Sequence, residues 1–194
     1  MRIGKTRWED RQPGEVRYYA PDRGTSVFAD DLNERVPRPY GAWHLEAMDS
    51  HGAWIGSAAD LARFASAFDD PQNCKILKPK SIEAMFARSP GLAGHDEKGR
   101  PKNVYYSLGW MNRVVGDGKF NRWHTGSLGG TAALLVRRHD GRNWVLLFNA
   151  RVSPHASHLG RAVDGLVHQA ANQVERWPEI DLFSKYGLKT AAIR

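Results

Sequence analysis

The sequence has little of what marks a disulfide-bonded, exported or membrane-spanning protein. A single cysteine, Cys74, excludes an internal disulfide. The longest uninterrupted apolar runs have five residues, as in 144–148, whereas a helix that crosses a bilayer needs about 20. Residues 1–7 carry charges with no apolar signal core behind them. We therefore expect no transmembrane segment and no signal peptide in this chain, and its localisation stays open.

Acidic residues are fewer than basic ones. The chain has 28 Lys and Arg against 21 Asp and Glu, a net charge of +7, with eight histidines in addition. Such an excess attracts anions such as nucleic acids or carboxylate substrates. The basic residues are spread along the chain, however, without a dense block or a nucleic-acid-binding motif. We expect a solvated basic surface and no specific nucleic-acid partner; a basic nucleic-acid binder is an alternative that rests on charge alone.

Residues 1–56 lack the pattern of any long helix, because prolines and glycines recur throughout them. This spacing predicts turns and extended segments, with short strands at 16–19 and 41–45. So long an irregular stretch is uncommon in a self-contained domain. We expect it to wrap around a larger body.

Two helices follow this segment. Ser57 with Asp60 forms a capping-box pattern, and apolar residues then recur at helical spacing up to Phe68. The run 69–71, Asp-Asp-Pro, is predicted to end this first helix. A second helix is predicted over 81–87, between two prolines.

The remaining chain is rich in β-prone residues and ends in one amphipathic segment. Residues 105–111 are aromatic, 116–119 form a turn, and 131–148 have the pattern of a hairpin. Beyond them, apolar residues from Leu159 to Val174 share one helical face. We expect this long helix to end at 177–178, Trp-Pro.

The most informative motif is the run 123–130, Trp-His-Thr-Gly-Ser-Leu-Gly-Gly, which enters the hairpin. At the end of a strand, Thr125 can place a hydroxyl beside a substrate carboxylate, and His124 can add a donor or a positive charge. Gly126 lets a substrate backbone approach the strand. The N–H of Ser127 can then bind a substrate carbonyl as half of an oxyanion hole. Taken alone, the run also fits a polar loop before a hairpin.

Four segments in order resemble class C β-lactamases and the related penicillin-binding DD-peptidases and serine esterases. Residues 52–64 resemble the glycine-rich turn and helix start downstream of that family's tyrosine motif. Residues 106–110 resemble the strand before its third catalytic motif, and 124–126 resemble that motif, with His in place of the commoner Lys. Residues 146–149 resemble the exit from its last strand.

The resemblance implies an α+β fold in which an antiparallel sheet is packed by a C-terminal helix, beside part of a helical lobe. Three strands are then expected, near 105–115, 120–136 and 143–149. We treat 1–194 as a single partial domain with four parts: an irregular wrapping segment (1–56), a helical part (57–103), a sheet with its C-terminal helix (104–176) and a tail (177–194).

Two motifs of that family are missing from this sequence. No Ser or Thr has a Lys three positions on, and no Tyr or Ser has an Asn two positions on. The family's acylated serine with its lysine, and its proton-moving tyrosine, therefore have no counterpart here. We expect the chain to correspond to the C-terminal half of such an enzyme, whose sheet edge, without its N-terminal strands, favours a homodimer.

The expected role is therefore to bind a substrate without supplying the nucleophile. The resemblance assigns substrate binding to His124, Thr125, Gly126 and Ser127, with Asn149 and Arg161 at the rim of the cleft. The substrate would be a β-lactam, a D-alanyl peptide or an ester, cleaved through an acyl-serine when the missing half is present. No catalytic residue, cofactor or metal is assigned. The alternative is a non-catalytic binding or interaction module on the same scaffold.

Other reactive residues offer weaker patterns. Ser57, Ser107 and Ser127 could pair with a histidine such as His44, His51 or His124, since triad groups meet in space rather than in sequence. No Gly-x-Ser-x-Gly elbow supports this arrangement. The histidines at 155, 158 and 168 lack the spacing of a metal site.

Overall fold

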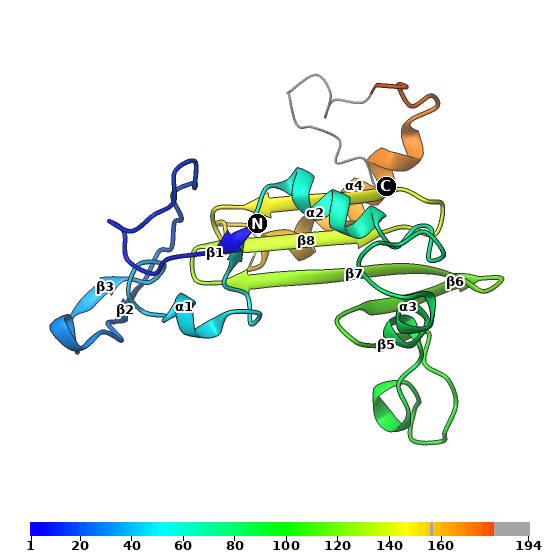
Figure 1. Ribbon diagram of the computed structural model, residues 1–194, viewed down its shortest axis with the longest axis horizontal. Coiled ribbons are helices and arrows are strands. Elements are labelled where there is room, and N and C mark those ends of the chain that lie inside the picture. Colours follow the sequence, from blue (N-terminus) through cyan, green and yellow to red (C-terminus); the bar gives the residue numbers. More distant parts are fainter. Residues whose placement is uncertain (156, 181–194) are drawn as a thin grey trace.

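A computed structural model describes residues 1–155 and 157–180. It shows a mixed helix and antiparallel-sheet architecture, which confirms the predicted α+β class (Figure 1). Most of the predicted tail, 177–194, lies outside the described residues. None of the helices in the described part is long and apolar enough to cross a membrane.

One five-stranded antiparallel sheet forms the body of the molecule. Its strands run in chain order across the sheet, each joined to the next by a hairpin. They are β5 (Val104–Tyr106), β6 (Met111–Gly116), β7 (Lys119–Leu128), β8 (Thr131–Arg137) and β9 (Asn143–Phe148).

Five strands replace the three that we expected. The segment near 105–115 is split into β5 and β6, and the segment near 120–136 into β7 and β8. Glycines cause both breaks: Gly109 and Gly130 have φ of +83° and +93°, values that residues with a side chain rarely adopt. Only β9 coincides with a single predicted strand.

Two short helices cover one face of the sheet. Helix α2 (Ala58–Ser66) begins with the predicted capping box, in which the Ser57 hydroxyl accepts from the N–H of Asp60 and the Asp60 carboxylate accepts from the N–H of Ser57. It ends at Ser66, before the acidic run expected to stop it. Helix α3 (Pro79–Phe86) begins two residues earlier than predicted, with proline in its first turn.

Helix α4 (Leu159–Gln173) packs on the opposite face of the sheet. Adjacent residues of β9 show this, since their side chains point to opposite faces. Val145 packs against the core beneath α2, whereas the Trp144 ring contacts His168 of α4. The predicted apolar face of α4 is only partly buried: Val163 and Val167 are half-buried, but Leu166 is 61% exposed.

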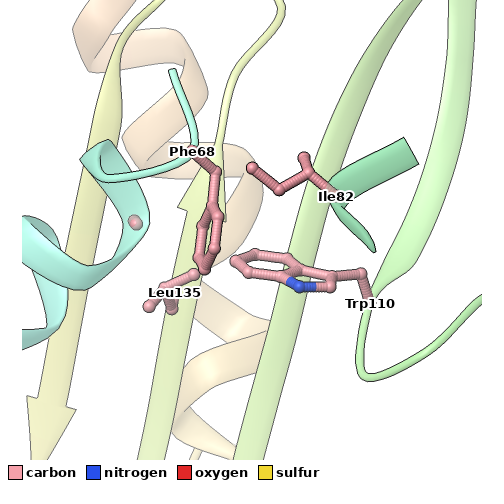
Figure 2. Packing of buried hydrophobic residues seen from close by; sticks show 5 residues of the cluster. Phe68, Ile82, Trp110 and Leu135 are labelled. Atoms are coloured by element: carbon pink, nitrogen blue, oxygen red, sulfur yellow. The ribbon is translucent and has the colours of Figure 1, made fainter. Parts of the chain in front are cut away.

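The main core lies between the sheet and the helices α2 and α3. Figure 2 shows Phe68 against Trp110, with Leu135 and Ile82 beside them. Rings meet edge to face here, with the Phe68 and Trp110 centroids 6.4 Å apart. Cys74 packs at the margin of this core as a free thiol.

The first 56 residues are irregular, as expected, and lie largely beside one end of the sheet (Figure 1). They contain only short elements, and the strands predicted at 16–19 and 41–45 do not form; Tyr19 makes a lone bridge to Ala150. The elements are β1 (Arg2–Ile3) paired with β4 (Trp54–Ile55), β2 (Arg23–Thr25) paired with β3 (Arg35–Pro37), α1 (Leu45–Met48) and the 3-10 helix Ala29–Asp31; a second 3-10 turn, Gly91–Ala93, follows α3.

Candidate functional site

Strand β7 carries the His-Thr-Gly-Ser run. On one side it is paired with a neighbouring strand for only half of its length. Its pairing with β8 extends from Arg122 to Leu128. Its pairing with β6 ends where Met111 meets Trp123. Within the described residues, the edge of β7 from 124 to 128 therefore has no strand beside it.

The register shows which backbone groups face this open edge. A two-residue turn, 129–130, joins β7 to β8, so the flanking pair Leu128 and Thr131 is hydrogen-bonded. Hydrogen-bonded and non-hydrogen-bonded pairs alternate along an antiparallel ladder. The N–H and C=O groups of Gly126 thus point to β8, whereas those of Thr125 and Ser127 point to the open edge.

Side chains flank this edge on both faces of the sheet. His124 lies on the face of α2, because its partner Leu135 belongs to that core. Thr125 lies on the face of α4, opposite buried Leu134. The next residue, Gly126, adds no side chain, so the backbone of the strand is accessible beside Thr125. We name the segment from His124 to Leu128 the β7 edge.

His124 has a partner that the sequence did not suggest. Its ring is exposed, and its Nε2 atom lies 3.1 Å from the hydroxyl of Tyr106 on β5. The turn at Gly109 makes this contact possible by folding β5 back beside β6. The sequence predicts one continuous strand near 105–115, and such a strand gives no indication that Tyr106 approaches His124.

An unpredicted cation, Arg122, lies two residues before His124 on β7 and therefore on the same face of the sheet. Arg122 stacks on Phe86 and Phe120, with its guanidinium carbon 4.3 and 4.9 Å from the two ring centroids. Burial, and then repulsion from Arg137, lowers the pKa of Arg122. Arg137 is paired with Asp69 at 2.8 Å, whereas Arg122 has no carboxylate partner within the described residues. Arg122 therefore adds a positive charge, without a carboxylate partner among the described residues, to the face that carries His124.

The two predicted rim residues lie away from the β7 edge. Asn149 follows β9, and its amide donates to the carbonyl of Arg17 at 2.9 Å. The backbone carbonyl of Asn149 accepts from the N–H of Tyr19, also at 2.9 Å. Arg161 lies in the first turn of α4, on the face opposite His124. The structure thus brings together His124, Thr125, Gly126 and Ser127, while Asn149 fastens the N-terminal segment.

The other candidate serines make local hydrogen bonds. The Ser57 hydroxyl belongs to the α2 cap. Ser107 is buried, where its hydroxyl bonds to the Trp110 carbonyl and accepts from Asn112. The ring of His44 packs against Phe28. No group of three or more His, Cys, Asp or Glu able to hold a metal occurs among residues 1–155 and 157–180.

Comparisons with solved structures give alignments at low identity. The chain aligns with a structure titled "Crystal structure of SurE" at a TM-score of 0.52 and 21% identity, covering 88% of this chain and 37% of that one. It also aligns with the octameric penicillin-binding protein homologue from Pyrococcus abyssi at a TM-score of 0.40 and 17% identity, covering 75% of this chain and 30% of that one. The chain thus spans less than two fifths of the length of each of these proteins.

A comparison with curated proteins finds no significant match. Among family models, the one described as "Beta-lactamase" matches residues 5–168. This match includes α2, the β7 edge and α4 as far as His168, so it covers every segment on which the resemblance rests. The chain belongs to the β-lactamase family.

Proposed function

We propose that the β7 edge is the substrate-binding strand of a β-lactamase-like serine hydrolase. The substrate is an acyl compound with a carbonyl and a carboxylate: a β-lactam, a D-alanyl peptide or an ester. The observation that carries this proposal is the open backbone of Thr125 and Ser127 along a strand that is paired on its other side.

An extended substrate can add to such an edge as a further strand, through main-chain hydrogen bonds. The N–H of Ser127 then binds the carbonyl oxygen of the substrate. An N–H aimed at that oxygen stabilises the negative charge that develops on it during acyl transfer. The carbonyl of Thr125 is available to accept from an amide of the substrate.

The carboxylate of the substrate is the second recognition element. The hydroxyl of Thr125 and the imidazole of His124 flank the β7 edge, and both can donate hydrogen bonds to the substrate carboxylate. Arg122 adds positive charge on the His124 side, close to the core. Tyr106 orients the imidazole through its hydroxyl.

Acyl transfer also requires a nucleophile, which we propose comes from a Ser-x-x-Lys segment outside this sequence. No such motif and no Tyr-x-Asn occur here. Loss of an activated nucleophile costs orders of magnitude in turnover. The chain alone is therefore expected to bind β-lactams reversibly and not to form an acyl-enzyme.

The test combines a covalent and a non-covalent measurement. A fluorescent penicillin is incubated with the folded chain, and intact-protein mass spectrometry searches for an adduct, while calorimetry measures reversible binding of benzylpenicillin. We expect saturable binding without an adduct, and weaker binding to Thr125→Val, whose side chain is matched in shape. An adduct on a serine would show that this chain contains its own nucleophile. If benzylpenicillin, N-acetyl-D-alanyl-D-alanine and simple esters all fail to bind, the non-catalytic interaction module is the better reading.

A further inference from the structure

A cavity of about 370 Å³ lies in the N-terminal segment, apart from the β7 edge. All of its lining residues fall between Arg7 and Gly41, and none belongs to β7. Its volume is within the usual range for small-molecule sites, about 300–1,000 Å³. The substrate-binding role proposed above makes no use of it.

Aromatic rings form part of its wall. The Trp8 and Tyr40 rings meet edge to face with centroids 5.0 Å apart, and Tyr18 lies 6.3 Å from Tyr40. The hydroxyl of Tyr40 accepts from the N–H of Tyr18 at 2.7 Å, which fixes both residues. Trp8 and Tyr19 remain 43% and 53% exposed, so part of each ring is open to solvent, while the Arg11 guanidinium lies 4.0 Å from the Trp8 centroid. Exposed rings around a cavity favour a flat apolar ligand.

The two arginines of the wall differ in their charge balance. Arg7 is neutralised by Asp30 and Asp31. Arg17 has no carboxylate partner within the described residues; it stacks on Trp8 and Tyr19, with its guanidinium carbon 5.0 and 5.3 Å from the ring centroids. A guanidinium held by two rings keeps its hydrogen-bond donors available for a carboxylate.

The backbone around this cavity is fastened to the sheet. The side-chain amide of Asn149 donates to the Arg17 carbonyl, and its backbone carbonyl accepts from the N–H of Tyr19, as described above. On the other side, Gly130 lies so close to Pro39 that an added Cβ would be 2.5 Å from the Pro39 Cγ atom. The wall is therefore ordered before a ligand binds, which lowers the entropic cost of binding.

We propose that this cavity is a second binding site, which takes a small ligand consisting of a flat aromatic ring and a carboxylate. The ring stacks among Trp8, Tyr18 and Tyr40, and the carboxylate pairs with Arg17. Of the two carboxylates on the lining, Asp31 is paired with Arg7, whereas Glu9 has no cationic partner among the described residues; its charge disfavours a ligand with a second negative charge.

Naphthoate serves as the probe, with naphthamide as its neutral counterpart of the same shape. Calorimetry with the full chain should show saturable binding of naphthoate, and the indole N–H resonance of Trp8 should shift in NMR spectra. We expect naphthamide to bind roughly 10-fold more weakly, since the charged hydrogen bond is lost. Arg17→Gln should weaken the binding of naphthoate by a similar factor and leave the affinity for naphthamide unchanged.

Arg100→Gln provides the control, since Arg100 is an exposed arginine paired with Asp96 outside the cavity. Its affinity for naphthoate should equal that of the unaltered chain, and circular dichroism confirms that each variant is folded. Equal affinities for naphthoate and naphthamide would overturn the role of Arg17. Absence of naphthoate binding, or a shift confined to other tryptophans, would overturn the site itself.

Discussion

The hydroxyl of Tyr106 on β5 lies 3.1 Å from Nε2 of His124 on the β7 edge. Strand β6 lies between β5 and β7, but its pairing with β7 stops at Trp123, so the two side chains can meet beyond it. This contact fixes one nitrogen of the imidazole and leaves the rest of the ring exposed. A ring that is already oriented loses less entropy when it meets a substrate carboxylate.

Removing that hydroxyl should weaken carboxylate binding without unfolding the protein. Tyr106→Phe frees the His124 ring, and immobilising one side chain costs about 0.5–1.5 kcal/mol, which corresponds to about 2- to 10-fold in affinity. Calorimetric titration with benzylpenicillin measures the change. Tyr105→Phe removes a tyrosine hydroxyl of the same strand that donates to the Phe86 carbonyl, and it should leave that affinity unchanged. An unaltered Kd for Tyr106→Phe would remove Tyr106 from the site.

Proline substitutions along β7 distinguish open from paired backbone groups. Ser127→Pro removes an N–H that faces the open edge, so stability should fall by no more than about 1 kcal/mol. Gly126→Pro removes an N–H that bonds to β8, and should cost about 2 kcal/mol more. Urea unfolding measures both. If Ser127→Pro is the more destabilising of the two, the assigned register is wrong.

The contact between the N-terminal segment and the β7–β8 turn depends on Gly130. Its φ is +93°, and an added Cβ would lie 2.5 Å from Pro39 and 3.2 Å from Tyr18. Gly130→Ala should therefore destabilise the protein by about 2–4 kcal/mol, through backbone strain and overpacking together. Gly141, with φ +81° and open space around it, is the matched control. Gly141→Ala should cost only about 1–2 kcal/mol, and equal losses would show that the segment is not docked on this turn.

We propose that β9 mediates a homodimer. It lies at the end of the strand order and carries neither charge nor proline, so little protects its outer edge from pairing with a second chain. Sedimentation should show a dimer whose population rises with concentration. Leu147→Lys, at a position 42% exposed on β9, should give monomers.

Leu166→Lys is the control for this assembly, because Leu166 is 61% exposed on α4 and not on the sheet edge. It should leave the dimer intact. A monomer at all concentrations for the unaltered chain would exclude pairing through β9. Loss of the dimer in Leu166→Lys alone would assign the interface to α4.

Local signals in the sequence predicted the parts of the fold that depend on local chemistry. The capping box of Ser57 and Asp60 is present as predicted, and so is the hairpin of β8 and β9, because caps and alternating apolar residues act over a few positions. The division of two strands by Gly109 and Gly130 was missed. Glycine is compatible with both strand and turn, and tertiary contacts decide which one forms.

The proposed site depends on local sequence only in part, for the same reason. The run from His124 to Ser127 is continuous in sequence, so one motif contains it. Tyr106 and Arg122 join it only through strand pairing and stacking, which no local pattern encodes. The resemblance implies a place for Asn149 at the rim of the cleft; in the structure its side-chain amide donates to the Arg17 carbonyl in the N-terminal segment.

Residue-resolved amide hydrogen exchange, measured by NMR with and without benzylpenicillin, examines the β7 edge itself. In the free protein, the amides of Thr125 and Ser127 should exchange rapidly, while those of Gly126 and Leu128, which bond to β8, are protected. Saturating benzylpenicillin should slow exchange at Ser127 and shift its resonance. Protection of Ser127 in the free protein, or ligand binding that leaves both Thr125 and Ser127 unchanged, would contradict the assignment of the β7 edge as the substrate-binding strand.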